Sequence, residues 1–395
     1  MLVKELRQVA SARPCIWLYT LSPQPTAKTI IPSYLRRPQP HGPLPVIIIH
    51  PEEPLKPADL DDYLTAGWRP AGQAIYCSDY LRTDADELYG CLQLRLPLKG
   101  FAFKKRHRKL MRRNEKKFRV EIGPASLPDA AMWEVNRRYM EVNPDKTRLD
   151  IEYHVLGELD RKVFDTHMIR LYDGDRLAGF SFFDVGVACA YTKAGIYDPE
   201  YAADSLGTYT ILLEIAWAVA QEKSYYHPGY FSPGFPAFDY KMSFGPMEYR
   251  EVRQGRWLAL PAERSDFPIG PLAENLAALK RLLSILPGHV IYAKILEYPS
   301  FTACFHYPGN RVGMLDVPYV MPIAGALAGM VIYDVTLGEY QYFRALPSGL
   351  RDTKVSPIGT SGMLRYEQPI KKGKVLARGA TAEELLAGLN LSAPK

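Results

Sequence analysis

The sequence predicts an α+β protein built from three regions, at residues 1–122, 123–260 and 261–395. A chain of 395 residues is longer than one typical domain, so two or three domains are expected. The middle region carries the clearest pattern, because three apolar strand segments are followed there by a helix and a fourth strand. The flanking regions have shorter patterns, and we expect a small N-terminal domain and an added C-terminal α/β module.

The first region consists of short segments separated by prolines. Residues 46–49 and 93–97 are apolar runs typical of strands, and residues 58–66 have the pattern of a short helix. Residues 22–45 are rich in proline and lack periodicity, which predicts a loop or a mobile arm. The first residues carry charges every few positions, so no signal peptide is expected.

The middle region begins with an amphipathic helix predicted at residues 127–143, with Pro128 and Asp129 suited to its first turn. The Asp-Gly-Asp sequence at 173–175 is a typical hairpin turn between two apolar runs. The elements predicted after the first helix are strands at residues 166–172, 176–184 and 187–197, a helix at 206–223 and a strand at 225–230.

The last region starts with a helix predicted at residues 271–286, with proline at its first position, where proline is tolerated. Residues 317–333 are uncharged, but this segment is shorter than the roughly 20 residues of a spanning helix and contains prolines and glycines. We therefore expect buried core there, and no membrane partner. The other predicted elements are strands at residues 290–298, 301–307 and 340–346 and a helix at 382–389.

Charge and cysteine content indicate a cytoplasmic protein with an acidic or polyanionic partner. The chain has 49 lysines and arginines against 43 aspartates and glutamates, a mild excess. Residues 99–119 are intensely basic, however, while the rest of the chain is nearly balanced. The five cysteines are odd in number and scattered, which favours reduced thiols over a disulfide framework.

The basic run predicts a helix that contacts RNA. If residues 104–117 form a helix, one narrow stripe can dock on the protein while cations cover the remaining surface. The alternative is an ordinary solvated face, although only Glu115 interrupts the run with a negative charge. The docking stripe consists of Phe103, His107, Leu110, Met111, Asn114 and Phe118. The candidate RNA-binding cations are Lys104, Lys105, Arg106, Arg108, Arg112 and Arg113.

The start of the helix at 206–223 is a candidate binding site for a phosphate or an oxyanion. Helix N-termini present free N–H groups and a positive dipole end. Asp204 or Ser205 can cap this helix, and Gly207 would let a ligand approach the backbone closely. The alternative is a capped core helix with a packing glycine. The candidate binding residues are Ser205, Leu206, Gly207, Thr208 and Tyr209.

Tyr240 and Lys241 form a second candidate site. A tyrosine next to a lysine can orient a phosphate or a ribose hydroxyl, and a lysine can hold a terminal phosphate as a point charge. The alternative is a solvated lysine beside a half-buried aromatic ring. The sequence contains no motif for a nucleophilic triad, a phosphate loop or a dinucleotide-binding turn.

Residues 229–249, together with the helix start at 205–209, resemble the core of the aminoacyl-tRNA–protein transferases. The residues that match this family's pattern in order and spacing are Tyr240, Lys241, Phe244, Pro246 and Glu248. The order of strands and helix in the middle region also resembles the acyltransferase fold of the N-acetyltransferase superfamily, which implies a mixed sheet flanked by helices. The transferase family moves arginine or leucine from a charged tRNA to the N-terminal amine of an acceptor protein.

This resemblance implies roles for the candidate residues. Gly207, Tyr240 and Lys241 would be catalytic, residues 205–209 would bind the donor, and Tyr240 and Lys241 would hold the tRNA end. Arg95 or the basic helix would read the acidic first residue that acceptors in this family often carry. Direct attack of the acceptor amine on the activated ester requires positioning and no covalent enzyme intermediate, which fits the missing triad. No cofactor is expected.

The cysteine pattern of the family is only partly kept. Residues 15–18, 67–72 and 91–97 resemble family segments, the second of them as Gly-Trp-Arg-Pro-Ala-Gly. An acidic insertion at residues 79–89 breaks the tight cysteine cluster. We therefore expect buried free thiols, no metal and no iron–sulfur cluster.

Three other functions stay open at this point. A coenzyme A-dependent N-acetyltransferase could use the same fold, although the single Gly207 replaces the doubled glycine pattern that grips the coenzyme A pyrophosphate. Aminoacyl transfer to a cell-envelope peptide is a related reaction. The insertion and the broken cysteine cluster could also mark a non-catalytic RNA-binding relative. No residue discriminates between arginine and leucine as the transferred amino acid.

Overall fold

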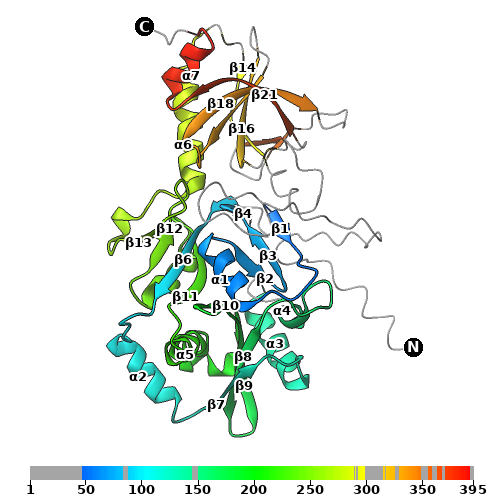
Figure 1. Cartoon of the computed structure of the whole chain (residues 1–395), viewed down its shortest axis with the longest axis vertical. Coiled ribbons are helices and arrows are strands. Elements are labelled where there is room, and N and C mark those ends of the chain that lie inside the picture. The colour runs from blue at the N-terminus through cyan, green and yellow to red at the C-terminus, as the bar shows by residue number, and fades with distance from the viewer. Residues whose placement is uncertain are drawn as a thin grey trace, which may run out of the picture.

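The computed structural model describes most of the chain from residue 47 to residue 391, and Figure 1 shows its arrangement. The described residues are 47–82, 88–144, 150–288, 290, 292–298, 315, 317–324, 329–347, 355–357, 363–366 and 370–391. The predictions that lie outside them are the loop at 22–45, the segment at 15–18, the strand at 301–307 and the centre of the insertion at 83–87.

An eight-stranded mixed sheet, called the central sheet below, has the strand order β13-β12-β6-β11-β10-β9-β8-β7 and lies in the lower half of Figure 1. Neighbouring strands are antiparallel except β10 and β11, which run parallel and are joined through the helix α5 (Leu206–Ala220). The strands are β6 (Leu92–Pro97), β7 (Arg119–Pro124), β8 (Thr166–Asp173), β9 (Arg176–Val185), β10 (Cys189–Tyr197), β11 (Tyr225–Phe231), β12 (Glu248–Arg250) and β13 (Trp257–Ala259). The predicted mixture of helices and a mixed sheet is confirmed.

The hairpin predicted around residues 173–175 is confirmed as β8 and β9, in which Asp173 lies opposite Arg176. Gly174 has a φ of 60°, in the left-handed region that favours glycine. The following strand, β10, begins at Cys189 rather than at residue 187. The reason is a second turn, closed by the hydrogen bond from Gly186 N to Cys189 O of 2.9 Å.

The helix predicted at 127–143 is α3 (Ala130–Val142), and it begins three residues later than the prediction. Asp129 lies outside the helix as its N-cap, and its carboxylate accepts a hydrogen bond of 3.0 Å from Met132 N. An N-cap residue has extended rather than helical backbone angles, so Pro128 and Asp129 precede the first turn instead of forming it.

The capping prediction for α5 is wrong. Ser205 occupies the N-cap position with a φ of 55° in the left-handed region, and its side chain makes no capping hydrogen bond. The Asp204 carboxylate instead pairs with Lys117 Nζ at 2.7 Å. The helix ends at Ala220 rather than at residue 223, because Glu222 already has a φ of 54°.

Both faces of the central sheet are covered. On one face α5 packs against apolar side chains of β6 and β8–β11, including Leu96 and Tyr226. On the other face α3 covers β8–β10 through residues such as Met132 and Phe180. The N-terminal elements cover the neighbouring part of that same face, where Tyr191 packs with their side chains. Residues between these layers are therefore removed from water.

The N-terminal elements form a small sheet in the order β1-β3-β2, a helix and a hairpin. The predicted strand at 46–49 and helix at 58–66 are confirmed as β1 and α1, and β6, predicted at 93–97, lies within the central sheet. These elements are β1 (Ile47–Ile49), α1 (Pro57–Thr65), β2 (Arg69–Ala71), β3 (Ala74–Cys77), β4 (Tyr80–Arg82) and β5 (Leu88–Gly90). A short helix, α4 (Tyr153–Leu156), precedes β8. The division of the chain at residues 122 and 260 stays a prediction.

The C-terminal region forms a second sheet, in the order β19-β20-β15-β16-β17-β18-β21, with two helices packed on it. The strand predicted at 290–298 is two short strands, β14 and β15, because each pairs with a different part of β16. The elements are α6 (Pro271–Ser284), β14 (Tyr292–Ala293), β15 (Leu296–Glu297), β16 (Tyr319–Ala324), β17 (Gly329–Asp334), β18 (Glu339–Pro347), β19 (Val355–Pro357), β20 (Leu364–Tyr366), β21 (Ile370–Gly379) and α7 (Ala382–Gly388).

The uncharged segment at 317–333 lies on β16 and β17, whose described side chains are mostly buried. The prediction of buried core is therefore confirmed for its described residues. In the part of the chain that the structure describes, no helix is long and apolar enough to span a membrane.

Replacing Asp129 by alanine removes the N-cap of α3 and is expected to lower the free energy of unfolding by about 1 kcal/mol. Asp129→Asn keeps a capping oxygen and loses only the ion pair with Arg170, so its effect should be smaller. Urea unfolding of both variants checks this, and equal losses would contradict the role of the cap.

Candidate functional site

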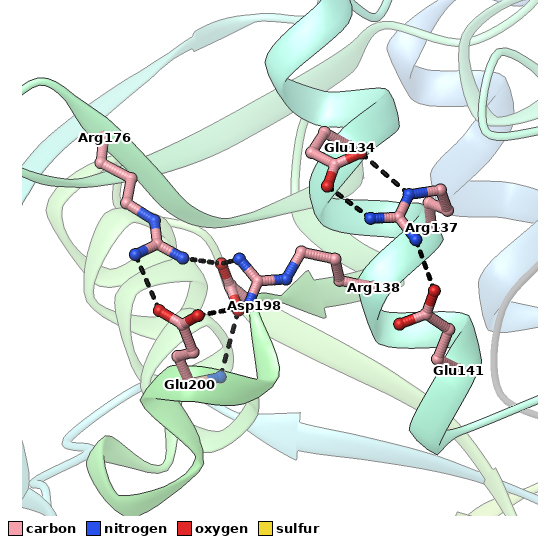
Figure 2. Close-up of polar contacts among 7 residues, drawn as sticks. All are labelled: Glu134, Arg137, Arg138, Glu141, Arg176, Asp198 and Glu200. Carbon is pink, nitrogen blue, oxygen red and sulfur yellow. Dashed lines mark hydrogen bonds and ion pairs between the residues drawn. The ribbon is translucent and has the colours of Figure 1, made fainter.

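A clamp of ion pairs fixes the chain just before α5 (Figure 2). Asp198 is only 2 % exposed, and its Oδ2 accepts hydrogen bonds from Arg138 at 2.8 Å and Arg176 at 2.5 Å. Its Oδ1 accepts from Glu200 N at 3.1 Å, and the Glu200 carboxylate contacts the same two arginines. Because the arginines come from α3 and β9, the clamp holds the 3-10 helix η3 (Pro199–Asp204) against both.

The start of α5 follows this clamp and leaves backbone donors available. Thr208 N and Tyr209 N both donate to Ser205 O at 3.0 Å, whereas the N–H groups of Leu206 and Gly207 have no acceptor among the described residues. A Cβ added to Gly207 would lie 3.4 Å from the Tyr197 ring, which is ordinary contact. Packing therefore does not require glycine here, which weakens the alternative of a packing glycine.

The strands β10 and β11 separate beside the start of α5. Residues Cys189–Tyr191 of β10 pair with residues Tyr225–His227 of β11. Both strands continue for several residues beyond this pairing. Each strand also has a register irregularity beyond this point, between Thr192 and Ala194 in β10 and after Tyr226 in β11. We call the open end of this pair the fork.

On the face of the sheet that α5 covers, this helix carries a buried carboxyl that sequence reasoning missed. Glu214 is fully buried, and its Oε2 accepts a hydrogen bond of 2.7 Å from the Tyr226 hydroxyl. Burial raises the pKa of Glu214 to about 7, so it can exchange a proton near neutral pH. The available signal was that Glu214 is the one charged residue in the otherwise apolar stretch 206–220.

On the opposite face of the sheet lies Lys241, which is 9 % exposed and not the solvated lysine of the alternative interpretation. Its Nζ donates to Tyr230 O at 2.7 Å and lies 4.8 Å and 4.9 Å from the ring centroids of Tyr230 and Phe238. Burial, with a smaller contribution from the positive charge of Arg69, lowers the pKa of Lys241 to about 7.

Arg69 is a second buried cation beside Tyr230, and sequence reasoning gave it no role. Its side chain is fully buried, donates to Ser78 O at 2.7 Å, and lies 4.6 Å and 4.7 Å from the rings of Tyr76 and Tyr230. The family-like segment at 67–72 contains this arginine, so the sequence did hold a signal for it.

Tyr240 and Arg95 have different surroundings. Tyr240 is half exposed and contacts Phe244 edge to face, and its partial burial and the Glu214 carboxylate both raise its pKa. Arg95 lies between the rings of Tyr225 and Trp257, and its Nε donates to Glu248 Oε2 at 2.6 Å. The family-like segments at 91–97 and 229–249 are thus joined by the ion pair of Arg95 with Glu248. Recognition of the acceptor by Arg95 stays a prediction.

The basic run forms the helix α2 (Lys105–Asn114), which is docked through buried His107 and Asn114 as the stripe predicts, with Lys104 at its N-cap position. Some of its candidate cations hold the helix in place, since Arg106 donates to Ser243 O and Arg113 to Ala203 O, both at 3.3 Å, and Arg108 donates to Phe103 O. The others remain at the surface, and a shallow hollow is lined by Lys109, Arg112, Arg113 and Lys116.

The described cysteines are buried free thiols, as predicted for Cys77, Cys91 and Cys189. Burial raises the pKa of Cys91 to about 12, so this thiol is protonated at neutral pH. Among the residues that the structure describes, no group of three or more His, Cys, Asp or Glu side chains could hold a metal ion.

Comparison with known proteins places the chain in a family. A family model described as arginine-tRNA-protein transferase, C terminus, matches residues 130–251. An aspartate/glutamate leucyltransferase of Leptospira interrogans is 28 % identical over 232 residues, 55 % of this chain and 82 % of that protein. A protein of the same name from Jannaschia sp. is 30 % identical over 234 residues, 54 % of this chain and 75 % of that protein. The chain belongs to the aminoacyl-tRNA–protein transferase family.

This transferase is an enzyme of the acyltransferase class. The matched residues 130–251 include the clamp, α5, the fork and Lys241, whereas Arg69 and α2 lie before them. Among solved structures, one titled "Crystal structure of FemX" is 11 % identical, with a TM-score of 0.29. The match covers 47 % of this chain and 63 % of that chain.

Asp198→Asn is expected to lower the free energy of unfolding by about 1–3 kcal/mol, because it removes one charge from a buried ion pair. The exposed pair of Glu134 and Arg137, also drawn in Figure 2, offers a control, since Glu134→Gln should change stability little. Chemical denaturation checks both variants, and equal effects would contradict the clamp.

Glu214→Gln should make the transferase more stable than the wild type at pH 8, by about 1–3 kcal/mol. The folded-state pKa of Glu214 is raised to about 7 from an ordinary value of 4.5. The wild type therefore loses stability relative to the variant as the pH rises from 4.5 to 7, and the full difference is present above pH 7. Urea unfolding at pH 5 and pH 8 checks this, with exposed Glu141→Gln as control, and a difference independent of pH would contradict it.

Proposed function

We propose that this transferase moves leucine from charged tRNA to the N-terminal amine of acceptor proteins that begin with aspartate or glutamate. The observation that carries the proposal is the fork, where β10 and β11 separate beside the start of α5 and its free N–H groups. The names of the two relatives, each an aspartate/glutamate leucyltransferase, support leucine and an acidic acceptor. The family model is named for arginine, so arginine is the second donor to test.

The central sheet is proposed to be N-acetyltransferase-like. Three features support this assignment. The sheet has one parallel pair of strands, a crossover helix joins them, and the two strands separate after three residue pairs. The start of α5 then faces the open end of the fork, where an acyl donor can lie between the strand ends.

The donor is proposed to bind at residues 205–209, with Gly207 nearest to the reacting ester. The N–H groups of Leu206 and Gly207 and the positive end of the helix dipole would stabilise the oxyanion that forms at the ester carbonyl. Tyr240, half exposed near Glu214, would contact the terminal adenosine.

The reaction needs positioning more than chemical activation. The acceptor amine, with an ordinary pKa of about 8, is partly neutral at physiological pH and attacks the ester carbonyl carbon. A C–N bond forms, the ester C–O bond breaks, and the amine proton ends on the leaving ribose oxygen. Holding amine and ester together can lower the barrier by several kcal/mol.

The tRNA is proposed to lie across α2, which would direct its acceptor end to the fork. Lys105, Lys109 and Arg112 are exposed on this helix. The same helix is fastened to the segment before α5, because Asn114 Nδ2 donates to Asp204 O at 2.9 Å. A phosphate backbone bound to α2 therefore lies next to the proposed donor site.

The test is transfer of radiolabelled leucine or arginine from charged tRNA to peptides that begin with Asp, Glu, Lys or Arg. Label from leucyl-tRNA on the N-terminal amine of Asp and Glu peptides is expected. Label only from acetyl-CoA would identify an N-acetyltransferase instead, and tRNA binding without transfer would identify a non-catalytic relative. A parallel reaction with a cell-envelope peptide tests the remaining alternative.

Replacing Lys105, Lys109 and Arg112 together by glutamine should raise the KM for charged tRNA and leave kcat at saturating tRNA nearly unchanged. The slope of log affinity against log salt should become shallower by about 2, because three phosphate contacts are lost. Lys280→Gln, at an exposed position on α6, is the matched control. An unchanged salt slope would contradict tRNA binding by α2.

A further inference from the structure

The face of the fork opposite α5 contains two buried cations, Arg69 and Lys241. The Arg69 Cζ and Lys241 Nζ lie 4.7 Å and 4.8 Å from the ring centroid of the same residue, Tyr230. The two charges can therefore be no farther apart than the sum of these distances. We call this pair the two-cation site.

A third buried cation of the chain shows how such a charge is usually accommodated. The side chain of Lys193 is 3 % exposed, and its Nζ forms an ion pair of 2.8 Å with the Asp184 carboxylate and donates to His154 O at 3.1 Å. Buried charges are normally paired in this way because leaving water is costly.

Lys241 has no such partner among the described residues. Its one hydrogen-bond acceptor there is the carbonyl of Tyr230, so two of its three N–H groups are available. The ionisable groups acting on it are Cys91, a protonated thiol, and Arg69, which is also positive. No carboxylate among the described residues pairs with Lys241, so its positive charge is not neutralised by an acidic partner there.

The backbone beside Lys241 carries no side chain at Gly229. Gly229 has a φ of 87°, and a Cβ built on it would lie 3.4 Å from Lys241 Nζ and 3.8 Å from Tyr191 Oη. An ammonium and a phenol hydroxyl thus converge over a position without a side chain. Two such donors fit the two oxygens of one carboxylate.

We propose that Lys241, with Tyr191, binds the side-chain carboxylate of the acceptor's first residue, and that Arg69 strengthens this binding through its charge. Arg69 is fully buried and donates to Ser78 O, so it acts without touching the ligand. This inference rests on the proposed function and gives Lys241 an acceptor carboxylate as its ligand in place of a tRNA phosphate. Exposed cations such as those of α2 suit the RNA backbone better.

The experiment compares two peptides that differ only in the first residue, Asp or its neutral isostere Asn. Equilibrium binding of each peptide is measured without donor, and transfer is measured with charged tRNA. The wild type is expected to favour the Asp peptide by at least about tenfold in both assays, because a charge-assisted hydrogen bond is lost with Asn.

Lys241→Met should abolish this preference in both assays, because the Asp peptide loses the charged partner of its carboxylate. Removing a buried cation without an acidic partner should not prevent folding, which a thermal unfolding curve checks. Tyr191→Phe should reduce the preference by a smaller factor. Lys280→Met, an exposed change on α6, is the control that should retain it.

Equal affinity of the wild type for the two peptides would overturn the proposal, whether or not transfer occurs. An equal loss on both peptides in Lys241→Met would also overturn it and would assign Lys241 to the donor or to the fold. If binding shows the Asp preference and its dependence on Lys241 but no amino acid is transferred, the two-cation site stands and the proposed function fails.

Discussion

One parallel strand pair determines where everything else in the site lies. A parallel pair requires a crossover connection, and here α5 supplies it between β10 and β11. The helix must therefore start beyond the carboxyl end of β10, which is the end at which the two strands separate. The free backbone N–H groups at the start of α5 therefore lie beside this open end. The fork thus combines a helix start with two strand edges that no longer bond to each other.

The two faces of the fork carry buried groups of opposite chemistry. Glu214 belongs to α5 and Lys241 lies on the opposite face, and burial moves the pKa of each to about 7 from opposite directions. Glu214 has Tyr226 as a donor, whereas Lys241 has only a carbonyl oxygen. Both arrangements reduce the stability of the folded state, and proteins retain such groups mainly where a ligand or a reaction uses them.

Local sequence patterns predicted the elements well but not the contacts that build the site. The turn at 173–175 and the apolar runs beside it determine the hairpin, because these signals act over neighbouring residues. The two-cation site brings together Arg69 and Lys241, which lie far apart in the sequence. Hydrophobic periodicity reports only on neighbouring residues and cannot predict such a contact. The left-handed Ser205 could not be predicted either, since the ion pair of Asp204 with Lys117 and the clamp at Asp198 position this segment.

The acidic insertion, which broke the family's cysteine pattern, has a structural role beside Lys241. Its strand β5 carries Tyr89, whose ring stacks on Phe235 at 5.2 Å and whose hydroxyl lies 3.2 Å from that of Tyr230. The next residue, Gly90, packs closely on α6, since a Cβ there would lie 3.0 Å from Leu272 N. The C-terminal region therefore supports β5, whose Tyr89 contacts the rings of Tyr230 and Phe238 beside Lys241. These rings form an aromatic wall next to Lys241 in this chain. A larger side chain at Gly90 would act on the site through this wall rather than through any contact with substrate.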